Sequence, residues 1–368
     1  MYTLPAYEEK LKDFFSRYTL EKIVAPSLKS ELKPKSERHC RFCKDKRQNM
    51  RFDGRSHLIP EFLGNEDLLS DFECDACNAY FAPMENQLAN SLGMMRTLWA
   101  LTRRGKVPVF PSPSGVTAKK ENFYGVKGIG ISRPDGGEGF RFDSKTGHFE
   151  VAFDKHSYTP VLVYKTLLKV ALSTIHEADV LNYDRAFQFL MTDEKAMGWC
   201  QILSTTSPTF VRVKEPSCTL FRKREYNDLL PSHMFMLSFE NMTYQFPLPF
   251  NIKDREVGVY NQPVIPIFCP PTFQNPPAIS LNVLREPVDL SSSEKLVREK
   301  GIISWDSDPQ LMAGLIAFDP VTGEKKDVKF DPDTIIQVHI TNEDGKPEFP
   351  FLKNDNEKST DATHRDKG

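Results

Sequence analysis

The 368-residue sequence has no run of 18 or more apolar residues, so it predicts no membrane-spanning helix. Residues 1–12 carry acids and lack an apolar core, so no secretory signal is expected. The formal net charge is only −2, and any affinity for a polyanion must therefore come from a local patch. Because no export signal is expected and the number of cysteines, seven, is odd, the sequence favours the reducing cytoplasm. The lack of a membrane-spanning run predicts that a membrane is not a partner.

The seven cysteines fall into two Cys-x-x-Cys pairs and three single residues. The pairs are Cys40 with Cys43 and Cys74 with Cys77. In a reducing compartment such pairs hold metal more often than they form disulfides, and four thiolates complete a tetrahedral zinc site. Thirty residues separate the pairs, enough for a β-hairpin whose ends the zinc would tie together. The single cysteines, Cys200, Cys218 and Cys269, are expected to be small buried side chains.

Composition divides the chain into segments. Residues 6–23 resemble a charged amphipathic helix, and a basic stretch follows between residues 28 and 55. Prolines and small residues at 107–115 mark a linker, which places a domain boundary near residue 105. We therefore expect an N-terminal helical segment (1–29), a small zinc-stapled domain (30–104), a larger domain (105–352) and a disordered tail (353–368).

The larger domain combines helical and strand patterns. Thr159 and Pro160 are typical of an N-cap and a first helical position, and apolar residues recur after them at helical spacing. Residues 197–350 alternate apolar and polar residues between proline-rich turns, which predicts mostly strands. The expected fold class is α+β, with a small zinc-bound domain followed by a larger, mixed and β-rich α+β domain.

Two segments around the cysteines carry a family resemblance. Ser56-His57-Leu58-Ile59-Pro60-Glu61-Phe62-Leu63-Gly64-Asn65 resembles the (Asp/Glu)-His-Ile-Ile-Pro-x-x-Leu-Gly-Gly signature of HNH endonucleases. Cys74-Asp75-Ala76-Cys77-Asn78 resembles the closing Cys-x-x-Cys-(His/Asn) element of that family. The resemblance covers roughly residues 40–92. It implies a ββα-metal domain, a hairpin followed by a helix, which the cysteine knuckles brace from outside.

The resemblance also implies a chemistry. His57 would be the general base that activates a water, and the side-chain oxygen of Asn78 would bind a catalytic Mg²⁺ or Mn²⁺. The cation would stabilise the charge that develops on the leaving oxygen of a phosphodiester. The implied protein is a metal-dependent endonuclease acting on double-stranded DNA, in anti-phage defence or restriction. The larger domain is expected to select a target, a regulatory ligand or a protein partner.

Two positions depart from the family pattern. Ser56 stands where the family has an acid that binds the metal, so either its hydroxyl or a nearby carboxylate must take that role. The nearby carboxylates are Asp53, Glu61, Asp75 and Glu85. The middle asparagine of the family has no clear counterpart, and Asn65 or Asp71 is expected to orient the histidine instead. Pro83 predicts a break in the helix that follows the second cysteine pair.

The basic stretch offers contacts for the DNA backbone. The candidate residues are Arg41, Lys44, Lys46, Arg47, Arg51 and Arg55. A solvated surface explains the same run, so the sequence leaves both interpretations open. The alternative function is a zinc-dependent nucleic-acid- or protein-binding module without catalysis. The oligomeric state has no signature in the sequence.

Overall fold

The computed structural model of the chain forms two compact units, which are described separately. The first comprises residues 1–96, 101–105 and 154–299, and the second comprises 97–100, 106–153 and 300–368. The structure describes all residues except 1–2, 30, 45–49, 102–105, 124–125, 135–138, 144–145, 194–199, 208–211, 226–228, 260–266, 274–282, 307–316, 319–324, 327–336 and 341–368. This division differs from the segments predicted by sequence, because the cysteine-bearing segment belongs to the same unit as residues 154–299.

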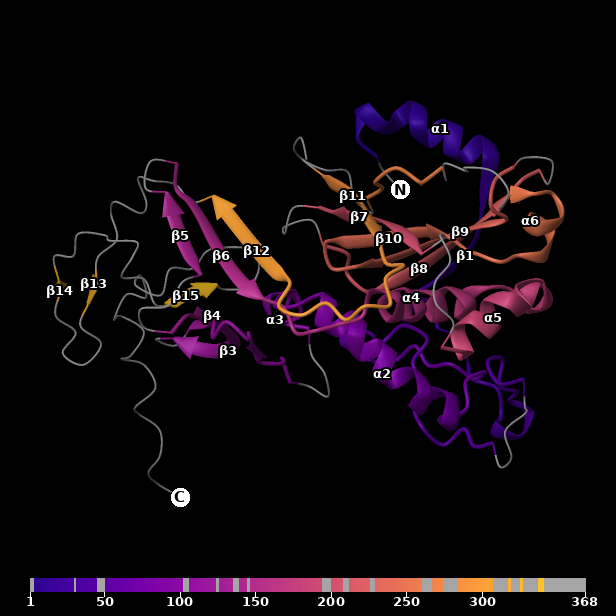
Figure 1. Cartoon of the computed structure of the whole chain (residues 1–368), viewed down its shortest axis with the longest axis horizontal. Coiled ribbons are helices and arrows are strands. Elements are labelled where there is room, and N and C mark those ends of the chain that lie inside the picture. Colours follow the sequence, from indigo (N-terminus) through magenta and orange to yellow (C-terminus); the bar gives the residue numbers. More distant parts are fainter. Residues whose placement is uncertain are drawn as a thin grey trace, which may run out of the picture. The chain divides into compact units, whose positions relative to one another are not determined.

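A six-stranded antiparallel sheet forms the centre of the first unit (Figure 1). Its strands, in spatial order, are β1 (Tyr18–Val24), β8 (Ser217–Lys223), β9 (His233–Phe239), β10 (Met242–Pro247), β7 (Gln201–Thr206) and β11 (Leu284–Asp289). The helices of this unit are α1 (Glu8–Arg17), α2 (Asp75–Ser91), α4 (Pro160–Thr174), α5 (Asp184–Met191) and α6 (Ile252–Glu256). Short 3-10 helices are η1 (Pro5–Tyr7), η2 (Pro26–Leu28), η3 (Lys35–Glu37), η4 (Glu61–Leu63) and η5 (Glu177–Tyr183).

The second unit consists of short antiparallel sheets. One has the order β15 (Gln337–Ile340), β4 (Val126–Ser132), β3 (Thr117–Phe123) and β2 (Phe110–Pro111). Another has the order β12 (Lys300–Asp306), β6 (His148–Asp154) and β5 (Phe140–Asp143). A third pairs β13 (Ala317–Phe318) with β14 (Lys325–Lys326), and the short helix α3 (Met95–Leu98) crosses the boundary of the units. The mixed α+β class predicted from the sequence is confirmed.

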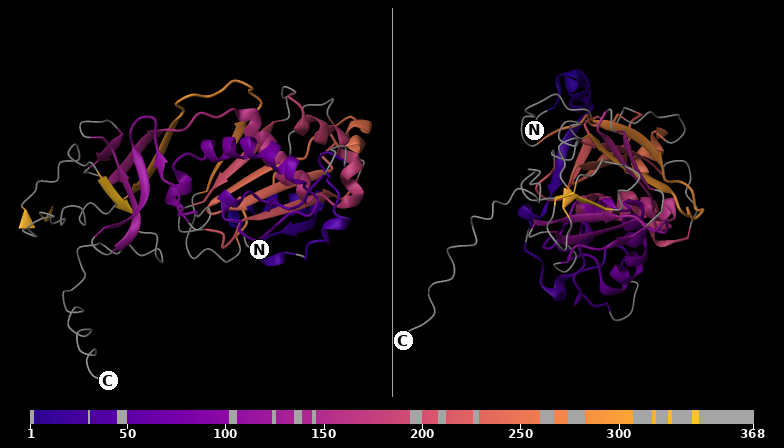
Figure 2. Two further views of the ribbon diagram at one scale, coloured as in Figure 1. Left: turned by 90° about the horizontal axis from the view of Figure 1, so that it is seen from below. Right: turned by 90° about the vertical axis from the view of Figure 1, so that its left-hand side faces the viewer.

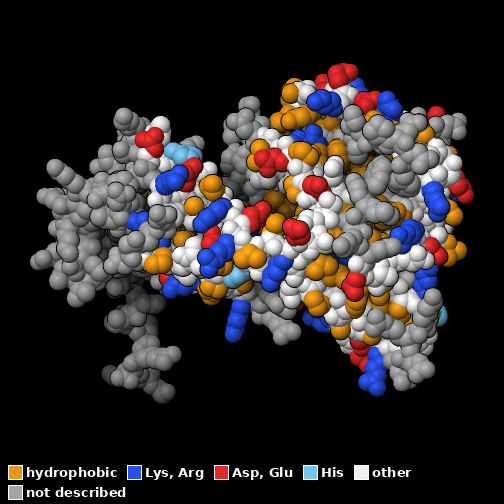
Figure 3. All heavy atoms as spheres, viewed as in Figure 1, with side chains coloured by type: hydrophobic (Ala, Val, Ile, Leu, Met, Phe, Trp, Pro, Cys, Tyr) orange, Lys and Arg blue, Asp and Glu red, His pale blue; other side chains and the backbone are white. Residues whose placement is uncertain are grey.

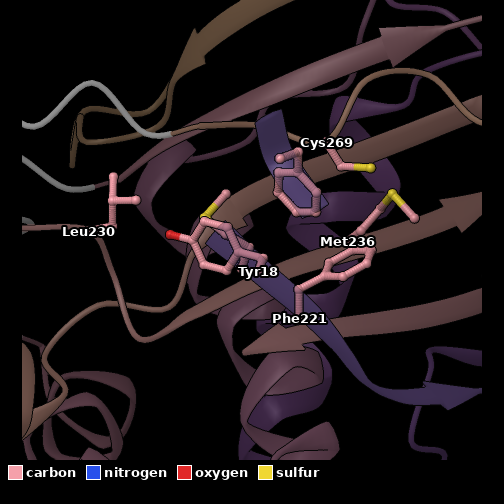
Figure 4. Close-up of a cluster of buried hydrophobic side chains, with 7 residues drawn as sticks. Tyr18, Phe221, Leu230, Met236 and Cys269 are labelled. Carbon is pink, nitrogen blue, oxygen red and sulfur yellow. The ribbon is translucent and has the colours of Figure 1, made fainter. Parts of the chain in front are cut away.

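The central strands of the six-stranded sheet are covered on both faces, and every residue of β9 is buried. On the face toward α1, Met234 and Met236 of β9 pack in one cluster with Phe14 of α1 and Phe221 of β8 (Figure 4). On the opposite face, Phe235 contacts Phe246 of β10, and Phe246 in turn contacts α4. Burial on both faces explains the apolar run Met234–Leu237 within β9.

Two local predictions are wrong. The predicted helix over 6–23 ends at Arg17, and Tyr18–Val24 pairs with β8 as an edge strand. Helix α2 continues through Pro83 without a break. Pro83 and Ala79 are exposed, so water can satisfy the carbonyl that loses its helical donor. The buried side chains of Phe81, Met84 and Leu88 hold the helix in place on its other side.

Helix α4 begins at Pro160 with Thr159 as its N-cap residue, as predicted, although the Thr159 side chain makes no cap hydrogen bond. It packs against the sheet and against α2, and Figures 1 and 2 show α2 beside α4. In the described part of the chain, no helix is long and apolar enough to cross a membrane.

Candidate metal centre and active site

The two Cys-x-x-Cys pairs come together, and their four Sγ atoms lie within 4.8 Å of one another. Cys40 Sγ is 3.6 Å from Cys77 Sγ, and Cys43 Sγ is 3.9 Å from Cys74 Sγ. Zn–S bonds of about 2.3 Å in a tetrahedral site place the sulfurs about 3.8 Å apart. The cluster therefore has the dimensions of a tetrathiolate centre. This largely buried group can hold a metal such as zinc.

The local backbone explains how the pairs meet. Lys44, just after the first pair, adopts a left-handed conformation with φ of 50° and turns the chain back. The backbone N–H of Arg41 donates to the carbonyl of Phe72, which ties the first pair to the segment before the second. Cys74 is the N-cap residue of α2 and Cys77 lies in its first turn, so the start of the helix places both sulfurs of the second pair.

The thiols share a hydrogen bond. The hydrogen bond between the Cys40 and Cys77 sulfurs lowers the pKa of the Cys40 thiol and raises the pKa of the Cys77 thiol. A thiolate is the form that binds zinc, so the cluster already favours a metal-binding protonation state at Cys40.

His57 lies on a short antiparallel pairing between the two cysteine pairs. Residues 56–58 face residues 68–70 around a bridge between His57 and Leu69. Backbone hydrogen bonds of 3.1 Å and 2.8 Å flank this bridge on its two sides. The second strand of the pairing leads directly into Cys74 and α2, so the order along the chain is strand, strand, helix.

Asn65 fixes the loop that joins the two short strands, and its side chain is fully buried. Its carboxamide nitrogen donates to the carbonyls of Ile59 (2.6 Å) and Leu68 (3.0 Å), and its oxygen accepts from the Leu68 N–H (2.8 Å). Asn65 therefore acts on the backbone of the pairing rather than on the imidazole. Asp71, the other residue expected to orient His57, accepts from the backbone N–H of Lys33.

The imidazole of His57 is held as a neutral ring. Burial lowers the pKa of His57, and this effect outweighs the charge of Glu61 and a hydrogen bond to the backbone carbonyl of Glu66, both of which raise it. Within the described part of the chain, Nε2 is buried and has no hydrogen-bond partner. With the other ring nitrogen donating to a carbonyl, Nε2 carries the lone pair. The ring is therefore neutral, and its Nε2 is buried in this structure.

A buried lysine connects this site to α4. Lys169 Nζ lies 2.9 Å from Glu73 Oε2 and 3.2 Å from Glu85 Oε1, and it donates to the backbone carbonyl of His57 at 3.2 Å. Burial opposes its charge, but Glu73 and Glu85 raise the pKa of Lys169, so it remains an ammonium ion. Burial raises the pKa of Glu73 to about 7. Glu85 is the open end of the group, with its side chain 22% exposed against 0% for Glu73.

The candidate metal-binding side chains do not all converge on His57. Ser56 is buried, and its hydroxyl donates to the carbonyl of Glu73 at 3.2 Å. Asp53 pairs with Lys35 at 2.6 Å, and the Asp75 carboxylate accepts from two backbone N–H groups at residues 53 and 54. Both Glu61 and Glu85 exert a charge on the His57 ring. Of these acids, Glu85 shares the Lys169 ammonium with the His57 backbone.

Asn78 lies in the first turns of α2, where its N–H donates to the Cys74 carbonyl at 2.9 Å. No hydrogen bond links Asn78 to His57 among the residues that the structure describes. Glu85 follows on the same helical face two turns later, about 10 Å along the axis. In the described part of the chain, groups of three or more His, Cys, Asp or Glu ligands occur elsewhere but not around His57.

The structure corrects one member of the predicted basic patch. The Arg41 side chain is only 7% exposed, and its guanidinium donates to the carbonyls of Leu172 (3.1 Å) and Ile175 (3.3 Å) at the end of α4. It is therefore unavailable to a phosphate.

The rest of the predicted patch is more open to solvent. Lys44 pairs with Asp184 at 2.5 Å, whereas Arg51 and Arg55 are exposed. Lys46 and Arg47 lie outside the described residues. On the face shown in Figure 3, described Lys and Arg side chains are interspersed with Asp and Glu.

Comparison with known proteins gives no family assignment. The chain matches no family model, no curated protein and no solved structure. The candidate site is therefore argued from its own residues.

Sequence reasoning missed Lys169 and Glu73. Lys165 and Lys169 sit in an otherwise apolar helix, and two charges among buried positions were the available signal. A second group, Glu21, Asp179 and His233, also has its ligand atoms within 4.8 Å of one another. Arg222 pairs with both carboxylates there and occupies the place of a cation.

Proposed function

We propose that this protein is a metal-dependent endonuclease of the HNH type, which hydrolyses phosphodiester bonds in DNA and is braced by a structural zinc. The observation that carries the proposal is the state of His57. A neutral imidazole with an unpartnered Nε2 lies on a short hairpin that leads into a helix, and four cysteines clamp the hairpin ends. This order of elements is the one that the family resemblance predicts.

His57 would take the proton of the attacking water through Nε2, since its other ring nitrogen is committed to a backbone carbonyl. Asn65 keeps the hairpin in register, so the ring stays in place during the reaction. When bound, a Mg²⁺ or Mn²⁺ ion supplies charge stabilisation at the leaving oxygen. Oxygen ligands suit these hard cations, and the side-chain oxygen of Asn78 is the α2 ligand that the family resemblance implies.

Glu85 is proposed to compensate for the acid that the family has at the position of Ser56. The Ser56 hydroxyl is directed to a backbone carbonyl, so it is a poor candidate for a ligand. Glu85 is partly exposed, and the Lys169 ammonium ion contacts both its carboxylate and the backbone carbonyl of His57. Exposed Arg51 and Arg55, on the segment that leads into the hairpin, are proposed to contact the DNA phosphates.

The test is nicking of supercoiled plasmid by the zinc-loaded full chain in Mn²⁺ or Mg²⁺. His57→Ala should lower the rate at least 100-fold, because general-base catalysis contributes about 10²- to 10⁴-fold. The matched control is His39→Ala, which removes an exposed imidazole beside Cys40 and should stay within about 2-fold of the wild type. Equal traces of nicking by wild type and His57→Ala would contradict the proposal.

The engaged Ser56 hydroxyl favours one alternative, a zinc-dependent binding module that has lost a metal ligand and with it catalysis. This alternative predicts DNA or protein binding that needs zinc but no Mn²⁺, and no metal-dependent nicking. DNA binding measured with and without Mn²⁺, beside the nicking assay, separates the two functions.

A further inference from the structure

We propose that a small polar cavity on the α1 face of the six-stranded sheet binds a phosphate group, either as the free ion or as the head of a small phosphate ester. Thr205 of β7 and Arg285 of β11 would hold it, together with hydroxyls of the neighbouring strands. The cavity lies outside the candidate active site, and this inference does not rest on the proposed endonuclease activity.

The cavity has a volume of about 30 Å³. It is lined by the hydroxyl residues Thr205, Ser207, Ser238 and Thr243, by Gln245 and Met236, and by residues 270–273. Met236 also belongs to the buried cluster that packs against α1, which places the cavity on that face of the sheet (Figure 4). A water needs about 10–15 Å³ of such space, so the cavity admits about two or three waters or one small oxyanion, but no sugar or nucleobase ring.

A row of polar side chains crosses the sheet at the cavity. Thr205 is paired with Thr243 of β10, and Thr243 is paired with Ser238 of β9. On its other side, Thr205 is paired with Arg285. Directly paired residues present their side chains on the same face of a sheet. The Ser238 and Thr243 hydroxyls lie 3.1 Å apart and share one hydrogen bond, so one of them keeps its proton for a ligand.

The Thr205 hydroxyl lacks the partner that a buried polar group needs. The residue is only 4% exposed, and its Oγ1 has no hydrogen-bond partner in the described part of the chain. Because Thr205 lines the cavity, the partner must come from whatever fills the cavity. Gln245 offers a further donor, since its carboxamide nitrogen gives one N–H to the carbonyl of Cys269 at 2.9 Å and retains a second.

Arg285 places a positive charge beside this row. Its Nη2 donates to the Cys269 carbonyl at 3.1 Å, so the guanidinium and the Gln245 carboxamide meet at one oxygen. Its Nε is buried and has no hydrogen-bond partner among the described residues. Burial lowers the pKa of Arg285, and no described carboxylate counters this effect. Because arginine stays charged, a half-buried guanidinium without a carboxylate favours an anion as its neighbour.

The alternative occupant is ordered water, which suits a polar cavity of this size. Water would satisfy the Thr205 hydroxyl, but it would leave Arg285 without a counterion. A phosphate group answers both needs, because its oxygens accept from hydroxyls and form strong hydrogen bonds with a guanidinium.

The test is isothermal titration calorimetry of the zinc-loaded full chain in a phosphate-free buffer. Inorganic phosphate and glycerol 3-phosphate are titrated separately, against sodium chloride of equal ionic strength. The wild type should bind one equivalent of phosphate group and no chloride. Binding of inorganic phosphate alone identifies the free ion as the ligand, and tighter binding of glycerol 3-phosphate identifies an ester.

Two variants remove the proposed contacts. Thr205→Val keeps the shape of the side chain and should weaken binding about 5-fold, whereas Arg285→Gln removes the charge and should weaken it at least ~20-fold. The matched controls are Thr206→Val, whose side chain lies on the opposite face of β7, and Arg255→Gln, an exposed charge on α6. Both controls should stay within about 2-fold of the wild type.

Thermal unfolding without phosphate gives an independent readout. Thr205→Val should not lower the melting temperature, because its hydroxyl has no partner to lose, and it should reduce the stabilisation that phosphate gives the wild type. A wild type that binds neither phosphate compound would overturn the proposal, and water would then be the occupant. Binding that Thr205→Val and Arg285→Gln weaken no more than their controls do would also overturn it.

Discussion

Replacing Arg41 by alanine should destabilise the first unit rather than weaken DNA binding. Its guanidinium donates to the carbonyls of Leu172 and Ile175, which end α4 without helical donors. Two such charge-assisted bonds contribute about 1.5 kcal/mol each. The contact over the Phe72 ring, at 4.1 Å, adds about 1 kcal/mol. The ion pair with Glu177 adds little, because that side chain is 77% exposed.

The expected loss in the free energy of unfolding is therefore about 4 kcal/mol, measured by urea denaturation followed with far-UV circular dichroism. Arg41→Lys should recover about half of it, since an ammonium ion lacks the planar guanidinium that lies over Phe72 while one of its nitrogens contacts both carbonyls. Arg51→Ala, an exposed change in the same basic stretch, should stay within about 0.5 kcal/mol of wild type. A loss below 1 kcal/mol for Arg41→Ala, or equal loss of DNA affinity in Arg41→Ala and Arg51→Ala, would refute the reasoning.

Chelation of zinc should raise the rate of amide hydrogen exchange in β9 as well as in the hairpin, because α2 packs on α4 and α4 packs on the sheet. Unchanged protection of β9 after verified loss of zinc would contradict this prediction. Asn65→Ala should cost about 3 kcal/mol in urea denaturation, from three buried hydrogen bonds, whereas exposed Asn86→Ala should cost almost nothing. Burial raises the pKa of Glu21, but His233 and Arg222 outweigh it and lower that pKa from 4.5 to about 2. The lowered pKa of Glu21 contributes at most ~3 kcal/mol to the free energy of unfolding. This contribution is fully present above pH 4.5 and is lost as the pH falls toward 2, so Glu21→Gln should flatten that part of the acid-denaturation profile.

The sequence predicts those features of the candidate site that depend on nearby residues. The cysteine cluster follows from spacing alone, because two short knuckles present their thiols in a fixed geometry. The mixed α+β class and the start of α4 at Pro160 follow from periodicity and capping residues. These features need no knowledge of distant partners, which explains why they could be predicted.

Two of the errors share one physical origin, the contribution of partners far away in the chain. The segment 18–24 becomes a strand because β8 offers it a ladder, and local helix propensity cannot reveal that neighbour. Arg41 is adjacent to a cysteine in a basic run, yet its partners lie more than 130 residues later. A charged side chain in a sequence shows what it can bind, but burial decides whether it binds solvent, a phosphate or the protein itself.

Helix α4 shows why residues 154–299 join the cysteine-bearing segment in one unit, although the composition changes near residue 105. Among its 15 residues, all but Leu162 are buried, so the helix needs packing partners on every side. The sheet covers one side through the contact between Tyr164 and Phe246. The other side carries Lys169, whose partners Glu73 and Glu85 belong to the cysteine segment. Separating the two parts would leave this ammonium and the Glu73 carboxylate without their partners, at a cost of several kcal/mol for each buried ion. The cysteine cluster and the six-stranded sheet therefore belong to one unit, although residues 106–153, which lie between them in sequence, belong to the other.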